Sequence, residues 1–204
     1  MTPALESATT PFGLALGQPV QGRGGQNCAI TDASNGPLVF QLGDAANLLS
    51  SAFGAGVYGD AAEQAAATRL NLDVNVADRP VLLEKLRAMD AEIRQQLPDR
   101  EFKSDVASAY KGLLTEDAKY STVRLRCKLQ LTGAHAAKVW RSDKTRVEDP
   151  KSIDWRATPF VAVVHFKSVW SMARQAGVVC EIKHLVAFPG GEDAFPLDAD
   201  AFPV

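Results

Sequence analysis

Residues 122–132, TVRLRCKLQLT, alternate strictly between apolar and polar side chains. A period of two is typical of a β-strand that buries one of its faces. The apolar positions are Val123, Leu125, Cys127, Leu129 and Leu131, and the opposite face carries Arg124, Arg126, Lys128 and Gln130. The segment therefore predicts a strand that presents three consecutive cations on one surface.

Other segments predict the elements around this strand. Residues 69–77, 160–170 and 178–188 are expected to be strands, with shorter ones at 37–43 and 138–141 and a turn at 174–177. Pro80 starts an amphipathic helix that ends before Pro98, and its apolar side is formed by Val81, Leu82, Leu86, Met89 and Ile93. A second short helix is expected around residues 60–67. Together these elements predict a mainly β chain with one or two helices (α+β), arranged as a small closed or partly open β-barrel.

Charge is distributed unevenly along the chain, although the formal net charge is only −2. Residues 1–120 carry 10 Lys and Arg against 15 Asp and Glu, whereas residues 121–188 carry 12 against 5. Residues 189–204 carry four acidic residues and no cation. A basic block followed by an acidic tail is expected of a chain that binds a polyanion and keeps an internal competitor for it. The alternative is that the basic block is only one solvated face.

Binding of single-stranded nucleic acid needs cations for the phosphates and exposed aromatic rings for the bases. The basic block offers both, because it contains all three tryptophans. The candidate binding residues are Arg124, Arg126, Lys128, Trp140, Arg141, Lys144, Arg146, Lys151, Trp155, Arg156, His165 and Lys167. Trp155, in a charged segment, is the tryptophan expected to be exposed. Burial in the core is the alternative for each tryptophan.

Other chemistries lack a sequence pattern. No glycine-rich loop is followed by Lys-Ser/Thr, the histidines and cysteines lack metal-ligand spacing, and no serine lies in a nucleophile elbow. We therefore expect no catalytic residue, metal or cofactor, and no enzyme. No apolar run approaches the roughly 20 residues that cross a bilayer, so a cytoplasmic protein without a membrane contact is expected.

Three segments resemble one family in their order along the chain. Residues 176–202, AGVVCEIKHLVAFPGGEDAFPLDADAF, resemble the last strand and acidic tail of the OB-fold single-stranded DNA-binding proteins of podoviruses. RLNLDVNVADRPVLLEKLRAMDAEI resembles their strand and long helix, and VRLRCKLQL their next basic strand. The resemblance implies a five-stranded OB barrel that binds single strands without sequence preference. It also implies a homo-oligomer, a dimer or higher, and a tail that recruits replication proteins.

These observations predict three parts: an irregular N-terminal arm at 1–37, a DNA-binding domain at 38–188 and an acidic tail at 189–204. The tail residues expected to contact partners are Glu192, Asp193, Phe195, Asp198, Asp200 and Phe202. The expected function is to coat single-stranded DNA during phage replication or recombination in an infected bacterial cell. One alternative is a single-strand-binding cofactor that brings a phage polymerase or helicase to its template through the tail or the N-terminal arm. The other is a structural phage protein with no nucleic-acid role.

Overall fold

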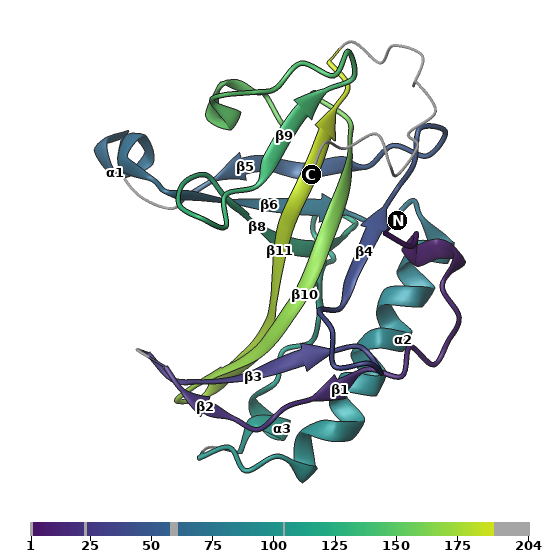
Figure 1. Cartoon of the computed structure of the whole chain (residues 1–204), viewed down its shortest axis with the longest axis vertical. Helices are drawn as coiled ribbons and strands as arrows, with labels where there is room; N and C mark the ends of the chain where they lie inside the picture. The colour runs from purple at the N-terminus through teal and green to yellow at the C-terminus, as the bar shows by residue number, and fades with distance from the viewer. Residues whose placement is uncertain (1, 23, 58–60, 104, 190–204) are drawn as a thin grey trace.

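Two long antiparallel strands, β10 (Phe160–Met172) and β11 (Gln175–Ala187), form a hairpin with which four of the other nine strands pair directly (Figure 1). The structure is a computed structural model that describes residues 2–22, 24–57, 61–103 and 105–189. Both strands were predicted, but the hairpin turn lies at Ala173 and Arg174, earlier than the predicted turn at 174–177. Ala173 has a positive φ of 45°, which allows this tight reversal. The hairpin is therefore longer than the sequence indicated.

The other strands extend the hairpin into an eleven-stranded sheet. Its path follows the order β1-β3-β10-β11-β8-β6-β5, while β2 pairs with β3, β4 with β10, β7 with β8 and β9 with β11. These strands are β1 (Ala15–Leu16), β2 (Val20–Gln21), β3 (Gln26–Thr31), β4 (Val39–Leu42), β5 (Ser50–Gly56), β6 (Arg69–Asn75), β7 (Leu114–Asp117), β8 (Thr122–Gln130) and β9 (Lys138–Arg141). The described pairs are antiparallel except those of β11 with β8 and with β9.

This topology confirms a mainly β chain with few helices. Within the described residues the path from β1 to β5 does not close on itself, so the five-stranded barrel is not confirmed. How the chain divides into domains stays a prediction.

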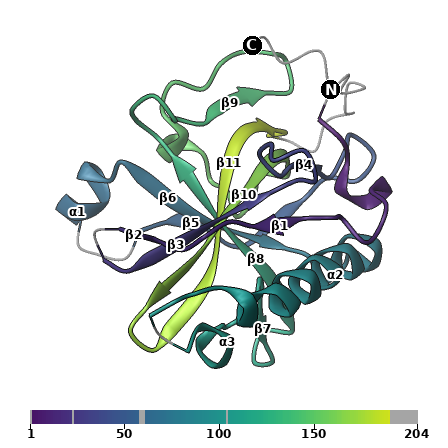
Figure 2. The same ribbon diagram turned by 60° about the horizontal axis from the view of Figure 1, so that its bottom comes forward.

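The longest helix, α2 (Pro80–Gln96), begins at the predicted proline and lies along one side of the sheet (Figures 1 and 2). Its buried side chains are Leu82, Leu86, Met89 and Ile93. The shorter helices are α1 (Ala61–Ala66), α3 (Val106–Ala109), η1 (Leu5–Ser7), η2 (Leu97–Asp99) and η3 (Pro150–Ser152). Of the helices in the described ranges, none is both long and apolar enough to cross a membrane.

The alternation predicted for β8 is confirmed. Leu125, Cys127 and Leu129 are fully buried and belong to the same core cluster as the apolar side of α2. Arg124, Arg126 and Lys128 lie on the opposite face, as the period of two requires. The sheet thus has an inner face that forms the core with α2 and an outer polar face.

The predicted irregular arm at 1–37 is wrong. This segment contains η1, β1, β2 and β3, and β3 pairs with residues 168–171 of β10. Leu5, Leu14, Leu16 and Ile30 are buried in the core. Glycines favour irregular structure in a sequence-based prediction, but Gly22 and Gly25 lie between two paired strands, β2 and β3. The N–H of Gly22 donates to the carbonyl of Gly25, and a Cβ on Gly25 would lie only 2.1 Å from the carbonyl oxygen of Ser171.

Candidate nucleic-acid interface

The outer face of the β10–β11 hairpin is polar at mid-height. Directly opposed residues of an antiparallel pair point to the same side of a sheet. His165 and Glu181 are such a pair and lie on the outer face, whereas the next pair, Phe166 and Cys180, is buried on the inner face. The imidazole and the carboxylate are therefore held side by side by the backbone register.

Two β-bulges place lysines on the same face. One lies between Val163 and Val164 and leaves Lys183 as an extra residue on β11, and the other leaves Lys167 as an extra residue on β10. A bulge redirects the side chain of its extra residue. Lys167 Nζ lies 2.8 Å from Oε1 of Glu181, and Lys183 Nζ lies 3.1 Å from Oε2. One carboxylate is thus bound by two ammonium groups from opposite strands.

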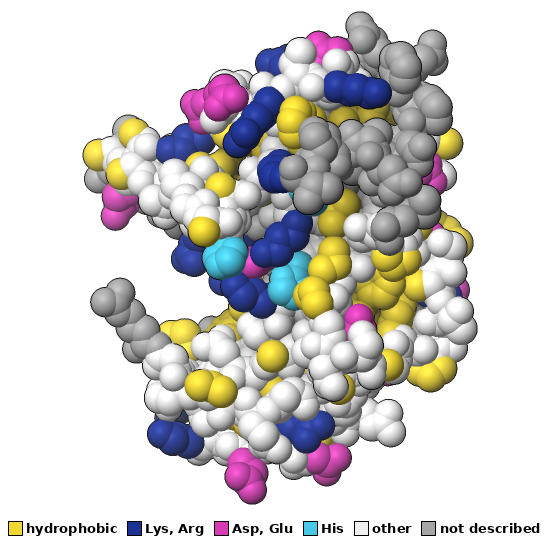
Figure 3. Space-filling view, in the orientation of Figure 1, with side chains coloured by type: hydrophobic (Ala, Val, Ile, Leu, Met, Phe, Trp, Pro, Cys, Tyr) yellow, Lys and Arg dark blue, Asp and Glu magenta, His cyan; other side chains and the backbone are white. Residues whose placement is uncertain are grey.

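The neighbouring strands continue this surface. Lys128 of β8 is in register with Glu181, and Arg126 follows on the same face of β8. We define the basic face as Arg69, Arg126, Lys128, His165, Lys167, Glu181, Lys183 and His184. In Figure 3, Lys, Arg and His side chains gather at mid-height over β10 and β11, beside a hollow that opens to the left of the view. Cations outnumber carboxylates on this face, so it attracts anions.

The pKa values on the basic face depend first on burial and then on the neighbouring charges. Partial burial lowers the pKa of Lys128, and the nearby Arg69 and Lys167 lower it further against the opposing effect of Glu181. Burial acts to raise the pKa of Glu181, but hydrogen bonds from Lys167 and Lys183 bring it below its usual value. Glu181 therefore stays ionised, and an added anion would relieve the remaining repulsion among the lysines.

Both histidines of the basic face are shifted toward the neutral form. Burial is the main cause of the lowered pKa of His165, followed by Lys183, with Lys167 acting in the same direction and Glu181 opposing them. Burial also lowers the pKa of His184, helped by Lys138 on β9 and by Lys183. Protonation of either imidazole is therefore coupled to whatever negative charge occupies the face.

Two of the predicted binding residues, Arg124 and Arg126, are engaged by an acid. Arg126 donates through Nε and Nη2 to Asp73, and Arg124 Nη1 donates to the same carboxylate at 3.0 Å. Arg124 also lies 3.6 Å from Asp117, and its side chain is only 13% exposed. Arg126 is 48% exposed and remains part of the basic face, but Arg124 serves mainly to hold β6, β7 and β8 together.

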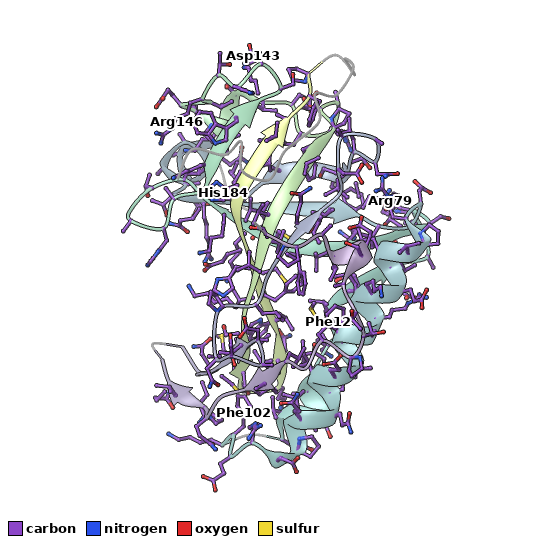
Figure 4. All side chains as sticks on the ribbon, turned by 45° about the vertical axis from the view of Figure 1, so that its right-hand side comes forward. Phe12, Arg79, Phe102, Asp143, Arg146 and His184 are labelled. Carbon is purple, nitrogen blue, oxygen red and sulfur yellow. The ribbon has the colours of Figure 1, made fainter. Side chains whose placement is uncertain are left out.

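The structure places the predicted loop cations in two other areas. Arg141, Lys144 and Arg146 surround the turn after β9, and Figure 4 shows Arg146 above His184 toward the end of the molecule. Lys151 Nζ donates to the carbonyl of Ala65 near α1, and Arg156 lies beside Gly54 of β5. Of the twelve predicted residues, the structure brings only Arg126, Lys128, His165 and Lys167 together on the basic face.

The tryptophans do not form the expected exposed platform. Trp155, predicted to be exposed, is 2% exposed, and its indole N–H donates to the carbonyl of Pro150. Trp140 packs against a small buried cluster that contains Val161 and Val186. Trp170 is half-buried with its indole against Gly177. The prediction for Trp155 is wrong because its charged neighbours sit in a loop that folds this ring inward.

Sequence reasoning missed several residues of the outer face. Lys183 and His184 are consecutive, so strict alternation assigns them to opposite faces, and only the bulge brings both outward. Arg69 was recognisable from the alternation in residues 69–77. Phe53 and Tyr120, described below, carry no pattern that predicts exposure. The predicted tail residues Glu192, Asp193, Phe195, Asp198, Asp200 and Phe202 lie outside the described residues.

Comparison with known proteins gives a distant structural similarity. The chain matches no protein-family model and no curated protein. Among solved structures it is similar to the single-stranded DNA-binding protein from bacteriophage Enc34, with 10% identity over 93% of this chain and 96% of that chain, at a TM-score of 0.48. The structure of the same phage protein in complex with single-stranded DNA is 8% identical over 89% of this chain and 98% of that chain, at a TM-score of 0.48. A C-terminal truncation of that phage protein is 10% identical over 88% of this chain and 98% of that chain, at a TM-score of 0.49. The podovirus-type family stays a prediction.

Proposed function

We propose that this protein binds single-stranded DNA on the basic face, without preference for a base sequence. The observation that carries the proposal is the convergence of Lys167 and Lys183 on the carboxylate of Glu181, with Lys128 in register beside it, next to a hollow of the surface (Figure 3). A phosphate backbone fits such a surface because each neutralised phosphate releases bound counterions.

The geometry favours backbone contacts over base reading. Adjacent strands lie about 4.8 Å apart, so β10, β11 and β8 distribute their cations over about 10 Å. Ammonium and guanidinium groups on such a sheet contact phosphates, which position a strand but carry no sequence information. This arrangement supports binding of strands of any composition.

Within this proposal the protein coats and protects single strands during phage replication or recombination and catalyses no reaction. An OB-type barrel of the podovirus kind, a homo-oligomer and a cytoplasmic location in the infected cell stay predictions from the sequence. So does a contact of the acidic tail with a phage polymerase or helicase.

Salt dependence tests the proposed backbone contacts. With about four phosphates neutralised, affinity for an oligo-dT strand is expected to fall about 50-fold between roughly 50 and 200 mM salt. Fluorescence anisotropy with a labelled strand measures this slope, and a labelled duplex of the same length serves as the comparison. Binding that ignores salt would contradict the proposal. Equal affinity for the duplex would refute single-strand preference, and binding to neither would favour a structural protein.

Affinity is also expected to rise as the pH falls from about 7.5 to about 5.5. The pKa values of His165 and His184 are lowered in the free protein, and a phosphate nearby would raise them, so binding takes up protons. The affinity should increase by at most about tenfold for each unit by which binding raises the pKa of one imidazole.

The double variant His165→Asn/His184→Asn separates this effect from general titration. Its affinity should vary less with pH than that of the natural protein, and circular dichroism at both pH values checks that the fold persists. A pH profile unchanged by the double substitution would show that the histidines do not face the strand.

A further inference from the structure

Two aromatic rings lie exposed and in contact on the outer side of the sheet. Phe53 of β5 is 38% exposed, and Tyr120, in the turn between β7 and β8, is 53% exposed. Their ring centroids are 5.5 Å apart and their planes meet at 79°. The other exposed large hydrophobic residues of the described chain are Val20, Val81 and Met172. Phe53 and Tyr120 are therefore the aromatic members of that exposed set.

Each ring is held by a cation. The guanidinium carbon of Arg124 lies 4.7 Å from the Phe53 centroid, and Lys119 Nζ lies 5.0 Å from that of Tyr120. Arg124 is itself fixed by Asp73 and Asp117. The ordered guanidinium of Arg124 thus holds the Phe53 ring in place, which limits the entropy lost when a further planar group stacks on the two rings.

A pocket connects this aromatic pair to the basic face. It has a volume of about 200 Å³, and its lining includes Phe53, Asn71, Asp73 and Arg126. Gly54 and Gly56 form its β5 wall; Gly54 has a φ of +78°, and a Cβ on Gly56 would meet nothing within 4 Å. The wall is therefore low and open, so a planar ring can approach the backbone of β5.

We propose that the Phe53–Tyr120 pair stacks an unpaired nucleobase, while the phosphates of the same strand continue over Arg126 to Lys128. The proposal rests on the proposed function and adds the position at which bases, rather than phosphates, are bound. A base exposes its ring face only when it is unpaired and unstacked, so this contact would also distinguish a single strand from a duplex.

The test compares two ligands with two ring variants. The ligands are oligo-dT and an abasic strand of the same length, which retains the phosphates and sugars but has no rings. The natural protein should bind the abasic strand about tenfold more weakly, equivalent to about 1.4 kcal/mol. Phe53→Leu and, separately, Tyr120→Leu should weaken binding of oligo-dT several-fold. Neither should weaken binding of the abasic strand.

Val81→Ala is the matched control, because it removes an exposed apolar side chain on α2. It should leave the affinities for oligo-dT and for the abasic strand unchanged. Thermal unfolding of each variant identifies any loss of fold, and the two ring variants are independent of each other. The salt slope should stay that of the natural protein, since no phosphate contact is removed.

The outcomes separate the two proposals. Equal affinity of the natural protein for both strands, with unchanged binding by both ring variants, would overturn the stacking site and leave the backbone contacts standing. Failure of the natural protein to bind either strand at low salt would overturn both. A loss in the ring variants that is the same for oligo-dT and the abasic strand would also overturn stacking, because it would reflect altered structure.

Discussion

A protein that lacks residues 1–37 is expected to be unfolded. The deletion removes β3, which pairs with β10, and takes Leu5, Leu14, Leu16 and Ile30 out of the core. Burial of a side chain of this size contributes about 1.5–3 kcal/mol. Four such losses approach the whole stability of a typical domain, about 5–15 kcal/mol. Circular dichroism and thermal unfolding of the purified deletion protein measure the effect.

Ile30→Ala provides a graded version of the same test. It should lower the free energy of unfolding by about 2–5 kcal/mol, whereas Val20→Ala, at an exposed position of β2, should have little effect. A deletion protein that still unfolds cooperatively at the original temperature would contradict the observed role of β3. Because this deletion is expected to unfold the protein, it cannot distinguish a coating protein from a polymerase-recruiting one.

The double variant Lys128→Glu/Lys183→Glu is expected to lose about 100-fold in affinity for single-stranded DNA, or about 2.8 kcal/mol. It reverses two charges at the centre of the basic face, next to Glu181. All sequences should be affected alike, because the lost contacts are to phosphates. Titration of oligo-dT and of a mixed-sequence strand at one salt concentration measures the loss.

Two further proteins control for charge and for folding. Arg87→Glu/Lys111→Glu makes the same change in net charge at exposed positions away from the basic face and should retain most of the affinity. Lys128→Gln/Lys183→Gln avoids a cluster of three glutamates and should show a smaller loss together with a shallower salt slope. Full affinity in the glutamate double variant would place the binding surface elsewhere.

The sequence predicted the elements whose periodicity is regular. The alternation in β6 and β8 and the helical spacing from Pro80 correctly gave a strand, a helix and a basic strand face. The N-terminal strands were missed because Gln26–Thr31 is short and follows a glycine-rich turn. Their pairing with β10 depends on a contact more than 130 residues away in the sequence, which local patterns do not encode.

The candidate site was predictable only in part. Lys128, His165 and Lys167 could be selected from charge and strand assignment, but the partners of Arg124 could not, because Asp73 comes from a strand 51 residues earlier. Trp155 was misassigned since charged neighbours do not determine where an indole points. Lys183 required knowledge of a bulge, which depends on pairing between strands rather than on either strand alone.

If the basic face binds a strand as proposed, Glu181 has a consequence for the rate at which that strand is exchanged. Its two oxygens keep the ammonium groups of Lys167 and Lys183 extended and ordered before any ligand arrives. A bound phosphate would then replace an anion that is already in place, so little of the side-chain entropy of a free lysine, about 2 kcal/mol, is left to lose. The same carboxylate is ready to recapture both lysines when the phosphate leaves. A surface built in this way suits rapid loading and release of a strand more than permanent retention.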